Sequence, residues 1–431
     1  MNFIVKKSKS ISGVLRVPGD KSISHRAIIF GSLAKGISTV RGFLQGADSL
    51  ATIKAFQDMG VRIENNFEEV VIHGVGINGL KPANKALNLG NSGTAMRLLS
   101  GVLAGQNFKS KLIGDESLSS RPMNRIITPL TKMSAKISSN NGTAPLEITG
   151  SQLKAIEYKM PIASAQLKSA ILLAGIYAKG KTCVIEPVKT RDHTERMLQG
   201  FGYPISIENN RICLNGDMKL NSCEIDVPAD ISSAAFFIVA ATITKNSQLT
   251  LNHVGINPTR TGIIDILRLM GANIKLQNQI LVGGEPVADI VVKSAPLHGV
   301  TIPSHLVPLA IDEFPVIFIA AAFAKGTTIL TDAKELKVKE SDRISSMVNG
   351  LKTLGVDARA TEDGAIIKGG AIINGGIVES YNDHRISMAF AVCGLIAVNP
   401  IEIKDCVNVN TSFPNFVKLA QKVGFNIKIG R

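Results

Sequence analysis

A repeated hydrophobic pattern runs through the chain. In six places a polar start is followed by a stretch that is rich in alanine and glycine and apolar on nearly every side of a helix. These stretches begin at Asp20, Asn91, Ser164, Asp230, Asp312 and Asn382. Successive starts are 71, 73, 66, 82 and 70 residues apart. Because a helix that is apolar all round is buried, the pattern predicts six similar units, each with a buried helix.

A second helix is predicted after each buried one. It is amphipathic and usually ends in a glycine, as between Ile263 and Gly271. Runs such as 249–253 and 287–292 predict strands between the units. The alternative, a chance alignment of alanine-rich helices, is disfavoured because both helices recur in the same order. Each unit is therefore predicted to run strand, helix, strand, helix and then short strands.

The length of the chain favours two domains. A chain of 431 residues is too long for one ordinary core. A break near Val227-Pro228 leaves three units on either side. The sequence therefore predicts an α/β protein with two domains of about equal size.

The net charge of +14 narrows the class of ligand. Nucleic acid, acidic membranes and small anions all attract a basic protein. No run of Lys and Arg exceeds two residues, Trp is absent and there are four Tyr, so stacking platforms for nucleic acid are poorly supported. The longest apolar runs, 234–243 and 316–324, are about half a membrane span. We expect a soluble, cytoplasmic protein that binds small anions, without nucleic acid or membrane.

The cysteines suggest a reducing compartment. Cys183, Cys213, Cys223, Cys393 and Cys406 are odd in number and form no C-x-x-C pair. We therefore expect free thiols and no structural zinc. The histidines show no metal-ligand spacing, so no metal or cofactor is expected.

The first repeated helix start carries chemistry suited to an anion. Asp20 and Ser22 are typical capping residues, and Lys21, Ser22 and Arg26 crowd the same helix end. Free N–H groups and the helix dipole favour an anion there. A phosphate site and an ordinary capped helix with a solvated Lys and Arg both fit this segment.

Similar side chains occur at the other helix starts. They are Asn91 to Thr94, Arg121, Ser164 to Lys168, Arg191, Asp312-Glu313, Lys339 to Arg343 and Asn382 to Arg385. A guanidinium group matches carboxylate and phosphate bidentately, so several arginines imply a substrate with more than one anionic group. Each segment alone also fits a cap, a turn or a local ion pair. The chain lacks Ser-His-Asp, Walker and dinucleotide-binding patterns, which argues against nucleotide hydrolysis and hydride transfer.

Five motifs together resemble a known family. They are Pro18-Gly19-Asp20-Lys21-Ser22, Gly90-Asn91-Ser92-Gly93-Thr94-Ala95-Met96-Arg97, Arg121-Pro122-Met123, Lys339-Glu340-Ser341-Asp342-Arg343 and Tyr381-Asn382-Asp383-His384-Arg385. In this order they resemble the 5-enolpyruvylshikimate-3-phosphate synthases, from about residue 4 to the C-terminus. Four segments also resemble the class II branch: Gly19-Asp20-Lys21, Ser164-Ala165-Gln166 with Lys168, Arg191-x-His193-x-Glu195 and Asn257-x-Thr259-Arg260.

The resemblance implies a fold of two inside-out α/β barrel domains built from six βαβαββ repeats, three per domain, that close on substrate like a hinge. Residues 20–228 would form the N-terminal domain. Residues 1–19 and 229–431 would form the C-terminal domain, with hinge crossovers near Gly19-Asp20 and Pro228-Asp230. The family also implies a monomer.

The resemblance further implies transfer of the enolpyruvyl group of phosphoenolpyruvate (PEP) to the 5-hydroxyl of shikimate 3-phosphate, with release of phosphate, in the shikimate pathway of aromatic amino-acid biosynthesis. The residues implied for shikimate 3-phosphate are Lys21, Ser22, Arg26, Ser164, Ala165, Gln166, Arg191, Asp312 and Lys339. Those implied for PEP are Lys21, Asn91, Gly93, Arg121, Gln166, Arg343 and Arg385. Asp312 is expected to be the base at the 5-hydroxyl and Glu340 the acid at the PEP methylene, with Lys21 assisting the leaving phosphate.

Two departures qualify the resemblance. Thr411 stands where class I enzymes carry a lysine before Phe-Pro, so no PEP contact is expected from that position. Gly93 stands where the best-known glyphosate-tolerant enzyme has alanine, so tolerance does not follow from class. The nearest alternative is the related UDP-N-acetylglucosamine enolpyruvyl transferase, but its catalytic-loop cysteine has no counterpart in 114–122. A basic nucleic-acid-binding protein is the alternative from another class.

Overall fold

The computed structural model describes residues 1–430 and divides into two compact units. Unit 1 contains Met1–Pro18, Pro228–Leu281 and Pro286–Arg431, and unit 2 contains Gly19–Val227 and Val282–Glu285. The boundaries therefore lie between Pro18 and Gly19 and between Val227 and Pro228. The sequence pattern did not predict that the short segment Val282–Glu285 groups with unit 2.

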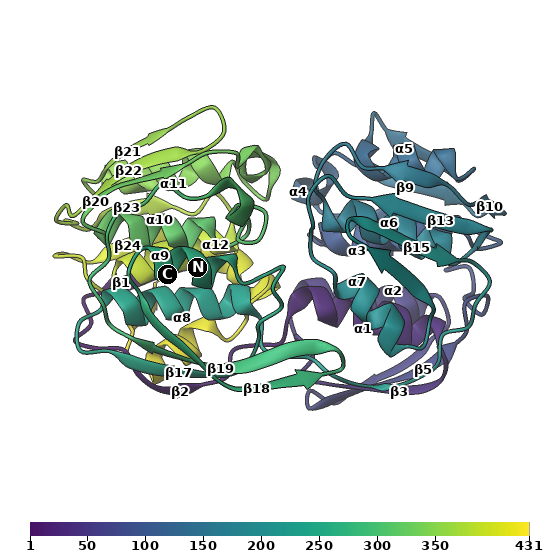
Figure 1. Ribbon diagram of the computed structural model, residues 1–431, viewed down its shortest axis with the longest axis horizontal. Coiled ribbons are helices and arrows are strands. Elements are labelled where there is room, and N and C mark those ends of the chain that lie inside the picture. Colours follow the sequence, from purple (N-terminus) through teal and green to yellow (C-terminus); the bar gives the residue numbers. More distant parts are fainter. Residues whose placement is uncertain (431) are drawn as a thin grey trace. The chain divides into compact units, whose positions relative to one another are not determined.

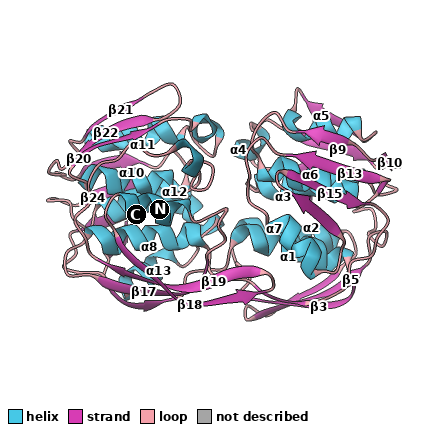
Figure 2. Cartoon of the chain, viewed as in Figure 1, coloured by secondary structure: helices cyan, strands magenta, loops and turns pink. Residues whose placement is uncertain are grey.

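Unit 2 has three buried helices surrounded by three four-stranded sheets and one two-stranded sheet (Figure 2). Its helices are α1 (Lys21–Leu33), α2 (Ala47–Asp58), α3 (Gly93–Ala104), α4 (Glu116–Ser119), α5 (Asn124–Lys132), α6 (Ala165–Gly175) and α7 (His193–Gly200). Its strands are β3 (Lys35–Arg41), β4 (Arg62–Asn65), β5 (Glu69–Val75), β6 (Leu87–Asn88), β7 (Lys109–Ile113), β8 (Lys136–Asn140), β9 (Thr143–Thr149), β10 (Leu153–Lys154), β11 (Glu157–Lys159), β12 (Ala178–Lys179), β13 (Lys181–Ile185), β14 (Ile205–Glu208), β15 (Arg211–Asn215) and β16 (Glu224–Asp226).

Unit 1 repeats this plan with three sheets (Figure 1). Its helices are α8 (Ile231–Ile243), α9 (Gly262–Leu269), α10 (Phe314–Phe323), α11 (Arg343–Thr353), α12 (His384–Cys393) and α13 (Phe416–Lys422), with 3-10 turns η1 (Ser304–Leu306), η2 (Lys334–Val338) and η3 (Cys406–Thr411). Its strands are β1 (Asn2–Lys6), β2 (Ser12–Leu15), β17 (Gln248–Gly255), β18 (Asn273–Val282), β19 (Glu285–Lys293), β20 (Gly326–Leu330), β21 (Asp357–Ala360), β22 (Ala365–Gly369), β23 (Gly376–Glu379), β24 (Ile401–Lys404) and β25 (Asn426–Gly430).

The five four-stranded sheets share one topology, which confirms the predicted repeat. In unit 2 the four-stranded orders are β16-β3-β5-β4, β6-β7-β9-β8 and β11-β13-β15-β14, and in each the first pair is parallel and the others are antiparallel. In unit 1 the orders are β18-β19-β17-β2, β20-β22-β21 and β23-β24-β1-β25. The N-terminal strand β1 lies between β24 and β25, antiparallel to both, with Phe3 opposite Ile403 and Ile429. Residues at both ends of the chain therefore build one sheet.

The six predicted buried helices are α1, α3, α6, α8, α10 and α12. Their N-cap residues are Asp20, Ser92, Ser164, Asp230, Glu313 and Asp383. All but Glu313 accept a backbone N–H of the first turn, as capping requires. In unit 2, a side chain at Gly101 of α3 would lie 2.2 Å from the carbonyl oxygen of Ala170 of α6. A glycine is therefore required where these two buried helices pack.

The cysteine prediction is wrong for two residues. Cys183 of β13 and Cys213 of β15 are direct cross-strand partners, with Cα atoms 4.1 Å apart, and they form a disulfide. Their separation of 30 residues carries no signal of this pairing, because it arises from the register of two antiparallel strands. Cys223, Cys393 and Cys406 are free. Within residues 1–430, none of the helices combines the length and apolarity needed to cross a bilayer.

Candidate active site

In unit 2 the N-terminal halves of α1, α3 and α6 are joined by side-chain hydrogen bonds. Arg26 of α1 donates from Nη2 to Ser169 Oγ of α6 at 2.8 Å. Between α3 and α6, Arg97 donates from Nη1 to Gln166 Oε1 at 2.7 Å, and Gln166 donates from Nε2 to Thr94 Oγ1 at 2.9 Å. The structure thus brings three predicted helix starts together, with Lys21, Ser22, Ser164, Ala165 and Gln166 on them.

Arg26 is buried in a set of neutral partners. Its Nε donates to Thr194 Oγ1 at 2.7 Å and its Nη1 to the carbonyl oxygen of Ser22 at 2.9 Å. Burial lowers the pKa of Arg26 to about 10, and the nearby Arg191 charge acts in the same direction. A guanidinium held among hydroxyl groups keeps a positive charge that an anion can neutralise.

Lys21 and His25 carry different charges on the same helix. Lys21 is half-buried and pairs with Asp48 of α2, with Nζ and Oδ2 3.0 Å apart. His25 is fully buried and shares hydrogen bonds with Thr52 at 2.7 Å and Ser92 at 3.4 Å. Burial, together with the charges of Lys21 and Arg26, lowers the pKa of His25 to about 3. The imidazole is therefore neutral and links α1, α2 and α3.

Arg121 and Arg97 converge on Gly93. Arg121 donates from Nη2 to Asn91 Oδ1 at 2.6 Å, and Asn91 donates to Asp115 Oδ2 at 2.8 Å. A methyl group at Gly93 would approach Nη1 of Arg97 to 2.9 Å and Nη1 of Arg121 to 3.2 Å. Two cationic groups thus face a position without a side chain, at the N-terminus of α3, where an anion is favoured.

Lys168 is held in buried ion pairs and is not exposed for substrate binding. It is completely buried, and its Nζ lies 2.6 Å from Glu195 Oε1 and 3.1 Å from Glu186 Oε2. Burial raises the pKa of Glu195, although Lys168 acts in the opposite direction. The Ser164 hydroxyl accepts from the Leu167 N–H at 3.4 Å, so it serves as a cap.

In unit 1, Arg343 lies among three carboxylates. Its Nε is 2.8 Å from Asp383 Oδ2, its Nη2 is 2.6 Å from Glu340 Oε2, and its Nη1 is 3.3 Å from Asp312 Oδ1. Burial acts to lower the pKa of Arg343, but these three charges raise it above its ordinary value. Burial likewise acts to raise the pKa of Asp383, but Arg343 holds it below its ordinary range. Both groups are therefore charged.

Asp312 is the point where the predicted residues of unit 1 meet. Its Oδ1 is 3.4 Å from Lys339 Nζ, and its carbonyl oxygen accepts from Arg385 Nη1 at 2.9 Å. Glu340 reaches this group through its ion pair with Arg343. Thr411 is tied into its own turn, since its Oγ1 donates to the Asn408 carbonyl oxygen at 2.7 Å.

A second cluster of buried polar residues contacts Arg385 through Glu313. Glu313 accepts a short hydrogen bond from the Ser232 hydroxyl, and its Oε1 is 3.7 Å from Arg260 Nη2 and 3.9 Å from Arg385 Nη1. Arg260 also pairs with Asp230 at 3.2 Å. The sequence predicted none of these contacts. The signal available was the recurrence of acidic residues at helix starts, here Asp230 and Glu313.

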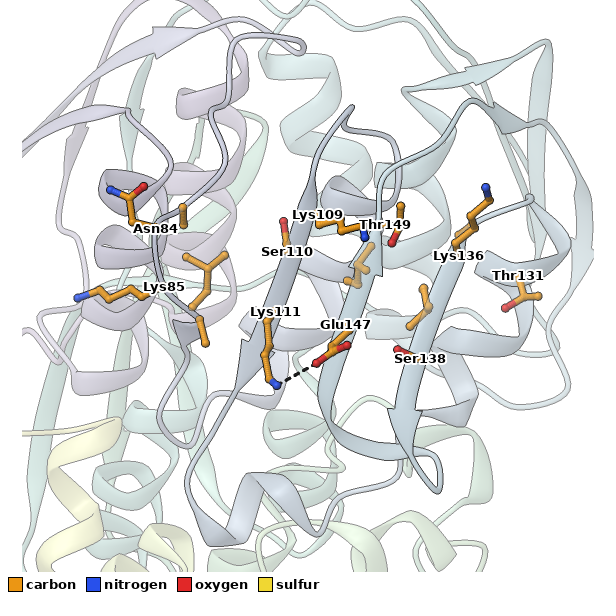
Figure 3. Close-up of a pocket in the computed structure, with 16 residues that line it drawn as sticks. Asn84, Lys85, Lys109, Ser110, Lys111, Thr131, Lys136, Ser138, Glu147 and Thr149 are labelled. Atoms are coloured by element: carbon orange, nitrogen blue, oxygen red, sulfur yellow. Dashed lines mark hydrogen bonds and ion pairs between the residues drawn. The ribbon is translucent and has the colours of Figure 1, made fainter.

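A large open pocket lies away from these residues. It has a volume of about 770 Å³ on the solvent face of the sheet that contains β7, β8 and β9, with Lys85, Lys109, Lys111 and Lys136 along it (Figure 3). Lys111 pairs with Glu147 at 2.9 Å. None of the predicted site residues lines this pocket, so part of the positive charge serves no predicted substrate contact. Among residues 1–430 no cluster of three or more His, Cys, Asp or Glu suited to a metal is found.

The chain is similar to proteins of one kind along its whole length. A family model described as EPSP synthase (3-phosphoshikimate 1-carboxyvinyltransferase) matches residues 5–419. A 3-phosphoshikimate 1-carboxyvinyltransferase of Ruthia magnifica subsp. Calyptogena magnifica is 60% identical over 429 residues, 99% of each chain. That of Alkalilimnicola ehrlichii is 59% identical and covers 100% of this chain and 97% of its own. A solved EPSP synthase from Acinetobacter baumannii superimposes with a TM-score of 0.91 at 53% identity and full coverage of both chains.

Proposed function

Because the chain belongs to the EPSP synthase family, it is a 3-phosphoshikimate 1-carboxyvinyltransferase of aromatic amino-acid biosynthesis, and we propose how its residues act. The reaction transfers the enolpyruvyl group of PEP to the 5-hydroxyl of shikimate 3-phosphate and releases phosphate. Two small, strongly anionic substrates must lie side by side. Fixed cations offset their mutual repulsion and align the reacting atoms.

The proposed shikimate 3-phosphate ligands are mostly in unit 2. They are Lys21, Ser22, Arg26, Ser164, Ala165, Gln166 and Arg191, with Asp312 and Lys339 from unit 1. The observation that carries this assignment is the joining of the N-terminal halves of α1, α3 and α6 through Arg26, Gln166 and Arg97. Backbone N–H groups at these three helix starts add donors for a phosphate or carboxylate.

The proposed PEP ligands come from both units. Lys21, Asn91, Gly93, Arg121 and Gln166 belong to unit 2, and Arg343 and Arg385 to unit 1. The convergence of Arg97 and Arg121 on Gly93 supports this assignment and adds Arg97, which holds Gln166 in place. Because the ligands are shared, we propose that the units close on the substrates about the crossovers near Gly19-Asp20 and Pro228-Asp230.

Two carboxylates divide the proton transfers in the proposed mechanism. Asp312 removes the proton of the 5-hydroxyl as its oxygen attacks C2 of PEP, and Glu340 delivers a proton to the methylene carbon C3. The tetrahedral adduct then loses a proton from C3 and expels phosphate, assisted by Lys21. Since Glu340 is ion-paired with Arg343 at 2.6 Å, this pair must loosen and Glu340 must take up a proton before it can donate one to C3. No covalent enzyme intermediate is formed.

The test is phosphate release with PEP and shikimate 3-phosphate. UDP-N-acetylglucosamine serves as the control acceptor, because the related transferase uses it with the same donor. We expect PEP to release phosphate when shikimate 3-phosphate is the acceptor and not when UDP-N-acetylglucosamine is. Release only with UDP-N-acetylglucosamine would overturn the proposal. We further propose a cytoplasmic monomer without a nucleic-acid partner, as the family implies. Steeply salt-dependent binding to DNA or RNA would contradict the last point.

A further inference from the structure

The tip of one long hairpin in unit 1 belongs to unit 2. Strands β18 and β19 are joined by Gly283 and Gly284, whose φ angles of 56° and 83° suit a two-residue turn. The tip segment Val282–Glu285 groups with unit 2. Because both glycines adopt positive φ angles, the chain can turn tightly at the point where the tip contacts α7.

Two polar contacts fix the tip to the first turns of α7. Glu285 Oε1 lies 2.7 Å from His193 Nδ1, and both residues are buried, with 3% and 2% of their surface exposed. Arg196 donates from Nη1 to the carbonyl oxygen of Gly284 at 2.6 Å and from Nε to Asp192 at 2.9 Å. A buried carboxylate needs such a partner, because its desolvation is otherwise unfavourable.

The same helical turn also contacts a proposed substrate ligand, Arg26, and the buried Lys168. Thr194 accepts from Arg26 at 2.7 Å, and Glu195 pairs with Lys168 at 2.6 Å. Arg191 precedes this turn by two residues. Helix α7 has eight residues, and the side chain of its N-cap residue, Asp192, does not cap a backbone N–H of the first turn. A helix this short depends on tertiary contacts for its position.

We propose that Glu285 is a positioning residue for the shikimate 3-phosphate site, acting through His193 and the first turn of α7. The Glu285–His193 contact holds that turn so that Thr194 orients Arg26 and the preceding loop presents Arg191. The inference rests on the proposed assignment of Arg26 and Arg191 to shikimate 3-phosphate. It concerns this substrate and not PEP, because α7 contacts Arg26 and follows Arg191, and both arginines are assigned to shikimate 3-phosphate only.

The test compares Glu285→Ala, Glu285→Gln and the control Gln279→Ala. Gln279 is exposed on the same hairpin. We expect Glu285→Ala to raise the Kd for shikimate 3-phosphate alone, measured by calorimetry, about tenfold, within the range for losing a hydrogen bond to a charged group. Glu285→Gln retains an acceptor for His193 and should raise the Kd less than about threefold. Gln279→Ala should leave it unchanged.

Steady-state kinetics separates positioning from a general loss of stability. The KM for shikimate 3-phosphate should follow its Kd, whereas the KM for PEP at saturating shikimate 3-phosphate should change less than about twofold. If the Kd in Glu285→Ala stays at the wild-type value, or if both KM values rise together, the inference is overturned. Should Glu285→Ala fail to fold, Arg196→Gln removes the other tie and must raise the same Kd.

The two proposals fail in distinguishable ways. Wild-type protein that releases no phosphate from PEP and shikimate 3-phosphate would contradict the proposed function. Normal wild-type turnover with unchanged binding in the Glu285 and Arg196 variants would contradict only the role of the hairpin tip.

Discussion

At the residue scale, charged side chains in the site are held by protein partners. The sequence placed Arg26 and Arg343 at helix starts, which is where the structure has them. It could not show that Thr194 holds Arg26 or that Asp383 and Glu340 hold Arg343. Thr194 is 168 residues from Arg26 along the chain, so only the fold brings them together. A helix-start pattern therefore predicts position well and partners poorly.

Replacing Asp312 by Asn tests the proposed base. The amide keeps the size of the side chain and its contacts to Lys339 and Arg343 in part, but it cannot take the proton of the 5-hydroxyl. We expect kcat to fall about 100-fold or more, the range for general base catalysis. Turnover near the wild-type rate would rule out this role for Asp312. The KM values should change less than kcat.

The buried His25 predicts a pH dependence of stability. Its pKa is lowered from 6.5 in the unfolded chain to about 3 in the folded protein, so between these values only the unfolded chain binds the proton. Above about pH 6.5 the histidine is neutral in both states and does not lower the free energy of unfolding. Below that pH the free energy of unfolding falls by about 1.4 kcal/mol for each unit by which the pH falls, until the folded protein also binds the proton. In His25→Gln the free energy of unfolding should fall less steeply from pH 7 to pH 5, measured by urea unfolding. Parallel slopes for both proteins would contradict the prediction.

At the element scale, capping residues and apolar faces located the buried helices, whereas the partners of short strands were not predictable. Strands β6, β10 and β12 have two residues each, which is too few for a hydrophobic period. The Cys183–Cys213 pair follows from the register of β13 and β15 and not from spacing. The repeat is visible in the sequence because all six buried helices need a similar apolar composition. The edge strands of the sheets are under no such common requirement, so they do not show the repeat.

The packing of α3 on α6 is tested by Gly101→Ala. The added methyl group would lie 2.2 Å from a backbone oxygen of Ala170, which cannot move like a flexible side chain. We expect a loss of about 3 kcal/mol in the free energy of unfolding, at the upper part of the range for overpacking. Urea unfolding measures it, with Gly200→Ala as the control.

Gly200 lies in α7, and a side chain there would have no neighbour nearer than 4.0 Å. The control should therefore be neutral or slightly stabilising. Equal free energies of unfolding for Gly101→Ala and the wild type would contradict the prediction. They would show that α3 and α6 can move apart without loss of stability.

At the scale of the whole molecule, the sequence predicted three repeats on either side of residue 227. That the first residues build a sheet with the last ones was implied by resemblance alone, because β1 by itself reads as an ordinary strand. The transfer of the tip Val282–Glu285 to unit 2 had no signal, since a Gly-Gly hairpin does not indicate what its tip contacts.

Removing residues 1–6 tests the role of β1 in unit 1. Phe3 and Val5 are buried, and Phe3 stacks on Phe416 with ring centroids 6.1 Å apart. Loss of a central strand separates β24 from β25, so we expect proteolysis to cut within residues 228–430 first and to spare 19–227. The exposed Lys7→Ala is the control and should be cut like the wild type. A fragment pattern identical to the wild type would contradict the prediction.

The central place of β1 also sets the order in which the molecule can be completed during synthesis. Residues 19–227 are continuous and carry all the strands of their own sheets, so that part can fold while translation continues. The first six residues must wait for β24 and β25, which end at Gly430. At about 5 to 20 residues per second, this wait is roughly 20 to 90 s. During that time the apolar strand β1 has neither of its partner strands.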